Sequence, residues 1–489
     1  WTNPAPQAAA LQGAILDGMQ GEDGRIFVLL HDQFSGSPTE GDLVLWVGQP
    51  HQLKEFGEGL FTLRLAALQG QQPIWGQLTL LDDGQMTTEA MLLSKSDQVE
   101  RISNETSLNQ INKLVPSRGY RLPVIDLDNQ TTGQVIVDRE QGQYLGHPTT
   151  VLLEDGQTIL CVYPKGHGRG SIVYKRSADG GLSWSDRLPV PENWVDSQEV
   201  PTLYEVIDPK TGKKRLIMWS GLYPARIATS EDDGLSWTPL EEVKSSEKED
   251  HAQWGGIVVM SCVEQLDNGQ YMAMFHDDGR YLRENGKPTN PVQFALYKTL
   301  SSDGGRTWSY PEAIWKGSDV HLCEPGLIRS PDGKTIAILL RENSRTRNSY
   351  VMFSRDEGKT WSAPRELPAA LTGDRHQGVY VPDGRLFISF RDTTLDSPTK
   401  GDWVAWVGTW EDILFGTPGQ YRVRLKDNKH RWDAAYPGVV IQPDGTIITT
   451  TYGHWDAGEK PYILSIRLTL EELDALAEES KNNDGAKTN

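Results

Sequence analysis

The octapeptide Ser177-Ala-Asp-Gly-Gly-Leu-Ser-Trp184 decides the fold of this chain. Its pattern, Ser-x-Asp-x-Gly-x-(Ser/Thr)-Trp, recurs at residues 230–237, 301–308 and 354–361. Four matches exceed chance, because residue frequencies give even one a probability on the order of 10⁻³. We expect each Asp to accept backbone N–H groups within a tight turn, while Gly supplies a positive φ. We call these octapeptides Asp boxes 1 to 4 and expect them to be structural rather than catalytic.

A second repeat alternates with the boxes. Turns of the Asp-Gly type lie between pairs of apolar runs, as expected for hairpins that join neighbouring strands. Their glycines are spaced 51 to 64 residues apart, at positions 156, 212, 269, 333, 384 and 445. Six four-stranded units of this length predict an all-β fold, namely a six-bladed β-propeller.

The ends of the propeller can also be predicted. We expect it to span residues 134–480, with Gln134-Val-Ile-Val-Asp138 completing the final blade beside Tyr462-Ile-Leu-Ser-Ile-Arg467. Thr469-Leu-Glu-Glu472 is a capping box that predicts a short C-terminal helix to about Glu479. A polar tail is expected over residues 481–489.

The first part of the chain contains no box. Its short apolar runs over residues 1–105 predict a separate small β domain, such as a sandwich. Residues 106–133 are predicted to be a connector, and we assign Tyr120-Arg121-Leu-Pro123 to it because this segment precedes the first hairpin by too many residues.

Composition excludes several classes of function. The net charge is −19, from 48 Lys and Arg against 67 Asp and Glu, which argues against partners such as nucleic acid or anionic membranes. No apolar run has the length of a membrane span. Three scattered Cys predict neither a disulfide framework nor a zinc site, and we expect no cofactor or metal.

Asp boxes on a six-bladed propeller resemble the sialidase (neuraminidase) superfamily, and this resemblance covers residues 134–468. It implies a site on the propeller axis, with Tyr436 as nucleophile polarised by Glu324. It also implies that Arg341 and Arg391 belong to an arginine triad that binds a substrate carboxylate. A neutral phenol avoids repelling such a carboxylate, and arginines bind it bidentately.

Blade one departs from the family pattern. Where sialidases have Tyr/Phe-Arg-Ile-Pro, this chain has Tyr144-Leu-Gly-His147-Pro148, and the loop that should hold an Asp general acid contains Gly166-His167-Gly168. We expect His147 and His167 to replace the arginine and the acid, because histidines exchange protons near neutral pH. The further candidate substrate contacts are Glu199, Tyr223, Arg226, His276 and Arg375.

These residues predict a sialidase-like exo-glycoside hydrolase that removes a terminal acidic sugar from a glycan with retention. His167 or a nearby acid would protonate the leaving group. Two alternatives stay open, namely a uronate-specific polysaccharide lyase that uses His and Tyr, and a non-catalytic glycan-binding propeller. Because glycan substrates are usually extracytoplasmic, we expect a periplasmic or secreted protein, although no targeting signal follows Trp1.

Overall fold

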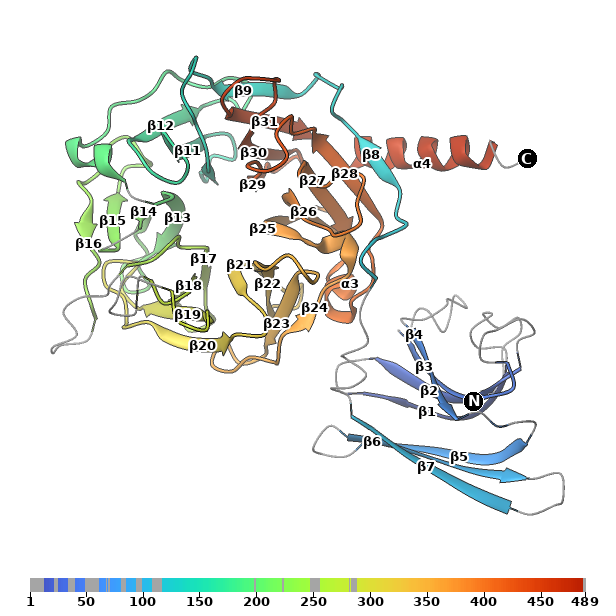
Figure 1. Cartoon of the computed structure of the whole chain (residues 1–489). Helices are drawn as coiled ribbons and strands as arrows, with labels where there is room; N and C mark the ends of the chain where they lie inside the picture. Colours follow the sequence, from blue (N-terminus) through green and yellow to red (C-terminus); the bar gives the residue numbers. More distant parts are fainter. Residues whose placement is uncertain are drawn as a thin grey trace. The chain divides into compact units, whose positions relative to one another are not determined.

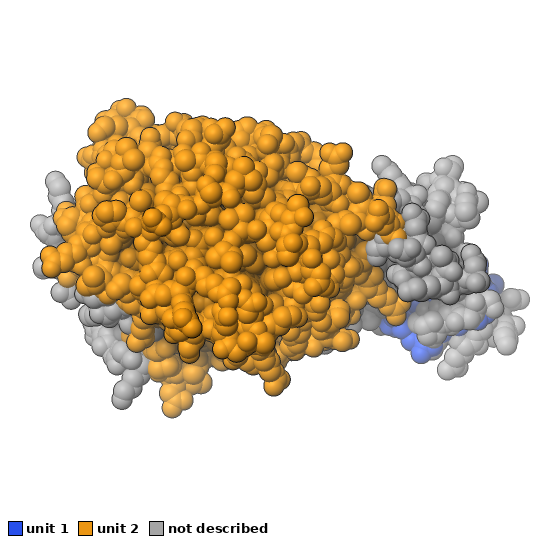
Figure 2. Space-filling view, turned by 90° about the horizontal axis from the view of Figure 1, so that it is seen from above, with its two compact units in different colours: residues 1–115, 411–417 blue, residues 116–410, 418–489 orange. Residues whose placement is uncertain are grey.

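The computed structural model divides the chain into two compact units. One comprises residues 1–115 with 411–417, and the other comprises residues 116–410 with 418–489 (Figure 2). The structure describes residues 13–21, 25–33, 40–48, 61–66, 68, 71–80, 85–93, 99–107, 117–197, 199–221, 224–246, 256–280, 282 and 288–486.

The N-terminal unit is a small β-sandwich, as predicted. One sheet consists of β1 (Gly13–Gln20), β2 (Ile26–Asp32), β3 (Leu43–Gly48) and β4 (Phe61–Ala66), and the other of β5 (Gln72–Leu80), β6 (Gln85–Leu93) and β7 (Val99–Ser107). Strands β2 and β3 are buried along nearly their whole length, whereas β6 of the second sheet alternates buried and partly exposed residues. Phe27 and Leu45 of the first sheet pack in one core cluster with Met86 and Leu92 of the second.

The second unit is the predicted six-bladed propeller, in which each blade is an antiparallel sheet. Blades one to three consist of β10 (Thr149–Leu152), β11 (Ile159–Pro164) and β12 (Ile172–Ser177); β13 (Thr202–Ile207), β14 (Lys214–Ser220), β15 (Arg226–Ser230) and β16 (Glu241–Glu242); and β17 (Cys262–Gln265), β18 (Tyr271–Asp277), β19 (Phe294–Ser301) and β20 (Glu312–Gly317). Blade four consists of β21 (Leu322–Arg329), β22 (Ile336–Glu342), β23 (Tyr350–Ser354) and β24 (Arg365–Glu366). Blade five contains β25 (Gly373–Tyr380), β26 (Leu386–Asp392), β27 (Trp403–Gly408) and β28 (Tyr421–Lys426). Blade six contains β29 (Gly438–Ile441), β30 (Ile447–Gly453) and β31 (Tyr462–Leu468). The short helices of this unit are η2 (Glu192–Asp196) and η3 (Ala369–Leu371), and its C-terminal helix is α4 (Leu470–Ala486). Helix α3 (Trp410–Phe415) lies almost entirely in residues 411–417, which group with the first unit.

Figure 1 shows the blades arranged in a ring, with β13, β17, β21, β25 and β29 innermost. The first strand of each blade therefore lies nearest the axis. As predicted, β9 (Gln134–Asp138) pairs antiparallel with β31, so the propeller begins and ends in the same sheet. The six turn glycines all have positive φ, between 67° and 89°.

The Asp boxes do more than close their own turns. In box 1, Asp179 accepts hydrogen bonds from the N–H and Oγ of Ser183, at 2.9 and 2.5 Å. Each box also accepts a hydrogen bond from the preceding blade at its fourth or fifth residue. The donors and acceptors are Arg467 and Gly180 O in box 1, Arg176 and Asp233 O in box 2, Arg215 and Gly304 O in box 3, and Lys298 and Gly358 O in box 4. The boxes therefore link neighbouring blades.

Three details differ from the sequence-based expectations. Blade one has three strands rather than four within the described residues, because Pro189 and Pro191 remove two backbone donors where the fourth would lie. Blade five gains a fifth strand, since β8 (Val124–Asp126) pairs parallel with β28. Helix α4 continues past the predicted end at Glu479 to Ala486, the last residue that the structure describes.

The predicted connector and capping box can be located. Tyr120 packs beneath Arg422 of blade five, with 4.7 Å between guanidinium and ring centre, which agrees with a connector role for this segment. Thr469 and Glu472 cap α4 reciprocally, the Thr469 N–H donating to Glu472 at 2.8 Å and the Glu472 N–H to Thr469 at 3.2 Å. Within the described residues, no helix is long and apolar enough to cross a bilayer.

We expect loss of a box carboxylate to destabilise the propeller. Asp303 of box 3 accepts hydrogen bonds from the N–H groups of Arg306 and Thr307 and from two hydroxyls. Asp303→Ala leaves these donors without their acceptor and should cost about 2 kcal/mol of unfolding free energy, measured by urea denaturation. Asp319→Ala, at an exposed position of the same blade, is the matched control. Equal stability of the two variants would contradict a stabilising role for the boxes.

Candidate active site

Three of the predicted residues meet at the axis. Glu324 lies in β21, Arg341 in the neighbouring β22, and Tyr436 just before β29. Arg341 Nη1 donates to Glu324 Oε1 and to the Tyr436 oxygen, both at 2.7 Å. The Tyr436 hydroxyl donates to the same Glu324 oxygen at 2.7 Å. We call this closed arrangement of phenol, carboxylate and guanidinium the tyrosine triangle.

Protonation in the tyrosine triangle follows from burial and charge. Burial raises the pKa of Tyr436, and Arg341 offsets this only in part, so the phenol is neutral. Burial also acts to raise the pKa of Glu324, but the charge of Arg341 outweighs it, and that pKa lies below its usual value. Among the described residues, Glu324 Oε2 has no hydrogen-bond partner. The carboxylate is therefore ionised and able to take the phenol proton.

The backbone explains how Glu324 reaches the axis. Its φ is 52°, and the register of β21 against β22 shifts between Cys323 and Gly326. His276, at the end of β18, accepts the Glu324 N–H at its Nδ1, 3.3 Å away, and burial lowers the pKa of His276 to about 4. The neutral imidazole is therefore an acceptor that holds Glu324 in place, and at 6% exposure it has little surface for a substrate.

The two predicted carboxylate-binding arginines share an internal partner. Arg391 Nε donates to Asp374 at 2.9 Å, and Arg341 Nε lies 3.3 Å from the other oxygen of the same carboxylate. Arg345 completes the group with a bidentate contact, in which its Nη1 and Nη2 donate to the two oxygens of Asp374 and the Nη2 distance is 2.8 Å. Asp374 is fully buried. We call Asp374 and its three arginines the arginine cage.

Asp374 is ionised within the arginine cage. Burial alone would raise the pKa of this carboxyl, but the charges of Arg341, Arg391 and Arg345 outweigh burial and hold the pKa well below its usual range. Arg341 and Arg391 were predicted from the sequence as site residues, whereas Asp374 was not. The available signal was position, since Asp374 starts the innermost strand β25.

A second cluster forms around Asp433, which precedes Tyr436 in the chain. The Tyr144 hydroxyl donates to Asp433 at 2.7 Å, His167 Nδ1 lies 3.0 Å from the same oxygen, and the Tyr452 hydroxyl donates to it at 3.1 Å. His454 Nε2 lies 3.3 Å from the other oxygen. The His167 side chain is 68% exposed, so its ring is held at one nitrogen while much of it faces solvent. We call this group the Asp433 cluster.

His147 joins the two groups. Its Nε2 lies 3.1 Å from the Tyr452 hydroxyl, and its ring centre lies 4.9 Å from that of Tyr436 and 4.7 Å from that of His167. Burial lowers the pKa of His147 well below its usual value, so this histidine is neutral. The predicted histidines of blade one thus lie beside the predicted nucleophile.

Glu199, which precedes β13, faces the loop that carries His167. A Cβ added to Gly168 would lie 2.9 Å from the Glu199 carboxylate, so the loop approaches closely because residue 168 is glycine. Burial raises the pKa of Glu199 to about 7, although Arg169 opposes the shift. A carboxyl with this pKa can donate or accept a proton near neutral pH.

The remaining predicted contacts lie elsewhere or outside the described residues. Arg375 is buried in β25, where its charge acts on Tyr204 and also helps to lower the pKa of His147. Arg226 begins the third strand of blade two, β15. Tyr223 lies outside the described residues. The part of the chain that the structure describes holds no group of three or more His, Cys, Asp or Glu placed to bind a metal.

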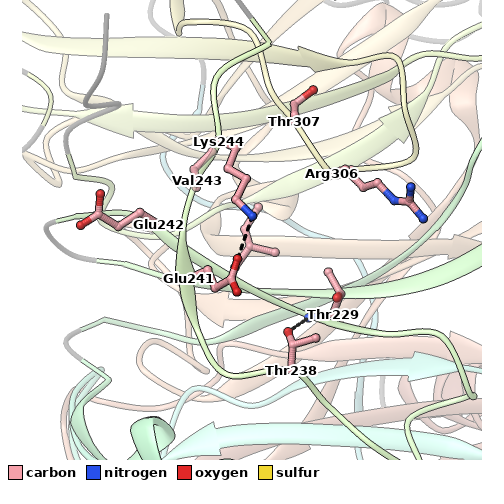
Figure 3. Close-up of a pocket in the computed structure, with 10 residues that line it drawn as sticks. Thr229, Thr238, Glu241, Glu242, Val243, Lys244, Arg306 and Thr307 are labelled. Carbon is pink, nitrogen blue, oxygen red and sulfur yellow. Dashed lines mark hydrogen bonds and ion pairs between the residues drawn. The ribbon is translucent and has the colours of Figure 1, made fainter.

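A surface pocket lies away from the axial residues. It has a volume of about 330 Å³ and is lined by β15, β16 and box 3. Figure 3 shows Lys244 reaching Glu241 across it, and these side chains lie 2.9 Å apart. Thr229 and Thr238 also bond to each other at 2.9 Å. The two cations of the pocket, Lys244 and Arg306, pair with Glu241 and Glu231, so we place the chemistry at the axis.

We expect Glu199 to lower stability at alkaline pH. Its pKa is raised from 4.5 to about 7, so the folded protein holds this proton more tightly than the unfolded chain, and stability falls as pH rises between these values. Glu199→Gln should therefore match the wild type near pH 4 and exceed it near pH 8, by at most about 3 kcal/mol of unfolding free energy. The exposed Glu192→Gln is the control. A pH-independent difference would contradict the assignment.

Comparison with known proteins agrees with this architecture. The model of the BNR repeat-like domain matches residues 188–448. A sialidase of Clostridium perfringens is 25% identical over 274 residues, which cover 49% of this chain and 66% of that protein, slightly less than two thirds of its length.

Solved structures resemble the chain at lower identity. A protein of unknown function from Dyadobacter fermentans has a TM-score of 0.54 and 15% identity, covering 69% of this chain and 97% of its own, and therefore shares the fold. An intramolecular trans-sialidase from leech has a TM-score of 0.48 and 13% identity, covering 94% and 91%. Since the family model matches more than half of its residues, this chain belongs to the BNR repeat-like family, within the sialidase/BNR superfamily.

Proposed function

We propose that the axial site cleaves a glycosidic bond in a glycan, with Tyr436 as nucleophile. The observation that carries this proposal is the tyrosine triangle, in which one carboxylate oxygen and one guanidinium both contact the phenol oxygen at 2.7 Å. Such a phenol can lose its proton as it attacks, which is the requirement for a tyrosine nucleophile. The sialidase relative adds support, because its name describes glycan cleavage.

The first step transfers the sugar to the protein. The Tyr436 oxygen attacks the anomeric carbon while its proton passes to Glu324, and the bond from that carbon to the leaving oxygen breaks. Arg341 contacts both the phenol oxygen and Glu324, so it stabilises the phenolate character that develops during attack. In the second step water attacks the same carbon, the Tyr436 oxygen leaves, and Glu324 returns the proton. Two displacements give retention.

The leaving group needs a proton, and we assign its delivery to His167. Asp433 contacts Nδ1 of this ring at 3.0 Å and orients it, as a carboxylate does in other acid–base histidine pairs. Among the described residues Nε2 makes no hydrogen bond, and the ring is largely exposed to an incoming glycan. After the aglycone has left, the neutral ring can accept a proton from the water that attacks the sugar bound to Tyr436. Glu199 is the nearby alternative acid.

The predicted terminal acidic sugar stays a prediction. It assigns the substrate carboxylate to Arg341 and Arg391, and both of these already bind Asp374. The nucleophilic mechanism does not require a charged sugar. The uronate lyase would need the same arginines, so Asp374 weighs against it as well. A glycan substrate favours the periplasm or the cell exterior as the site of action.

Replacing the nucleophile should abolish hydrolysis. We expect Tyr436→Phe to lower kcat/KM by at least about 10³-fold on any 4-nitrophenyl glycoside that the wild type cleaves, because phenylalanine cannot form the covalent intermediate. Tyr421→Phe is the matched control, since this hydroxyl also donates to a carboxylate, that of Asp474, but on the outer strand β28. Unchanged activity of Tyr436→Phe would rule out the mechanism, and an unsaturated product absorbing in the ultraviolet would identify a lyase.

The identity of the proton donor can be tested with two glycosides whose leaving groups differ in their need for a proton. His167→Ala should slow hydrolysis of a methylumbelliferyl glycoside by about 10²-fold or more, but slow a dinitrophenyl glycoside far less, because dinitrophenolate leaves without a proton. Glu199→Gln should slow both substrates equally. The reverse pattern would transfer the role of acid from His167 to Glu199.

A further inference from the structure

The arginine cage is complete without a substrate. Its three guanidiniums direct five nitrogen contacts at one carboxylate, and that carboxylate belongs to the protein itself. Two arginines, Arg341 and Arg391, are those that resemble a substrate-carboxylate site. Asp374 therefore neutralises the two arginines to which the resemblance assigns the carboxylate of an acidic sugar.

The arginine cage belongs to the axial site rather than to the core alone. The Arg391 guanidinium lies 5.5 Å from the centre of the Tyr436 ring, and Arg341 contacts the Tyr436 oxygen directly. The Arg345 side chain keeps 26% of its surface exposed and that of Arg341 16%, while Asp374 keeps none. The arginines thus reach the site, and the carboxylate closes them from behind.

A second buried ion pair shows what a purely structural pair looks like here. Asp392 and Arg422 lie 2.9 Å apart, and both side chains have no exposed surface. Asp392 is also bonded to hydroxyls of Ser397 and Thr399. This pair has no contact with the tyrosine triangle, and it serves as the internal reference for Asp374.

Charge balance opposes a further carboxylate in the arginine cage. Arg341 already contacts two carboxylates, Glu324 at 2.7 Å and Asp374 at 3.3 Å, and both are ionised. A substrate carboxylate placed against the same guanidiniums would lie near both of these negative charges. Like charges in such a site raise the cost of ionisation and weaken binding.

We propose that Asp374 is a specificity-determining residue, which neutralises the candidate carboxylate-binding arginines from within the protein, so that the axial site accepts sugars that carry no carboxylate at this position. The ligand class is a neutral glycoside. The inference rests on the proposed function only in taking the axial site as the place where sugar binds. Removal of the Asp374 carboxylate opens a subsite for anionic ligands.

Binding of small carboxylates tests this without turnover. The probes are glucuronate and acetate, each compared with its uncharged amide, glucuronamide and acetamide, at constant ionic strength. Thermal unfolding and calorimetry are measured for the wild type, Asp374→Ala and the matched control Asp392→Ala. Asp374→Asn, which keeps the shape of the side chain, is used for calorimetry if the alanine variant does not fold.

We expect neither carboxylate to raise the melting temperature of the wild type more than its amide does. Asp374→Ala should melt lower, because three guanidiniums lose their counter-charge, and acetate should restore its melting temperature saturably. Carboxylates should bind the Asp374 variants at least about tenfold more tightly than the wild type. Asp392→Ala should melt lower without rescue, since its site is sealed.

Three results would overturn the proposal. They are saturable stabilisation of the wild type by glucuronate or acetate but not by the amides, failure of both Asp374 variants to bind carboxylates, and release of an acidic sugar by the wild type from a panel of glycans. If no glycan is cleaved and Tyr436→Phe has no effect, the proposed function fails instead, while the carboxylate measurements still decide the role of Asp374.

Discussion

Hydrogen bonds from four of the six blades to the Asp box of the next blade help to hold the ring of blades on which the site depends. The backbone carbonyls of Gly180 and Gly304 accept side chains from the preceding blade, and the other two boxes do the same. These contacts add to the apolar packing between blades and fix neighbouring sheets against each other. The tyrosine triangle draws on blades four and six, and the arginine cage on blades four and five. Both exist only when the blades keep their positions.

Within this frame, unusual backbone conformations aim the functional groups. His147, Glu324, Arg375 and Ala435 all have φ between 52° and 57°, and each lies at or just before the first strand of its blade. Non-glycine residues adopt this region rarely, at a cost of about 1–3 kcal/mol when the surroundings impose it. Such strain is concentrated at functional sites, and here it recurs where four innermost strands meet the axis. The unfavourable backbone conformations therefore lower the stability of the fold while they orient the side chains that face the site.

The sequence predicted the repeating parts of the structure well, because they are local. Box and turn residues report their own conformations, so the blades, their hairpins and the strand that joins β31 could be derived from spacing. Tyr436, Glu324 and Arg341 could be placed by resemblance at matching points of two blades. Asp374 and Asp433 could not, because their importance comes from partners that are distant in sequence. Arg391 and His167, for example, contact them only in the folded chain.

The two departures from the sialidase pattern change the charge of the site in the same direction. A neutral, buried His147 stands where an arginine is expected, which removes one positive charge. Asp374 adds one negative charge among the remaining arginines. If the proposed site binds sugars, either change alone weakens binding of an anionic sugar, and together they reduce the excess positive charge that an arginine triad provides. The net charge of −19 acts the same way at longer range, because it repels polyanionic glycans before they reach the site. A neutral tyrosine nucleophile avoids repulsion from a substrate carboxylate. In the proposed mechanism it also avoids repulsion from Asp374 and Glu324, because an Asp or Glu in place of Tyr436 would be a third carboxylate beside them. The negative charges of Asp374 and Glu324 therefore favour a neutral phenol at this position as much as a substrate carboxylate would.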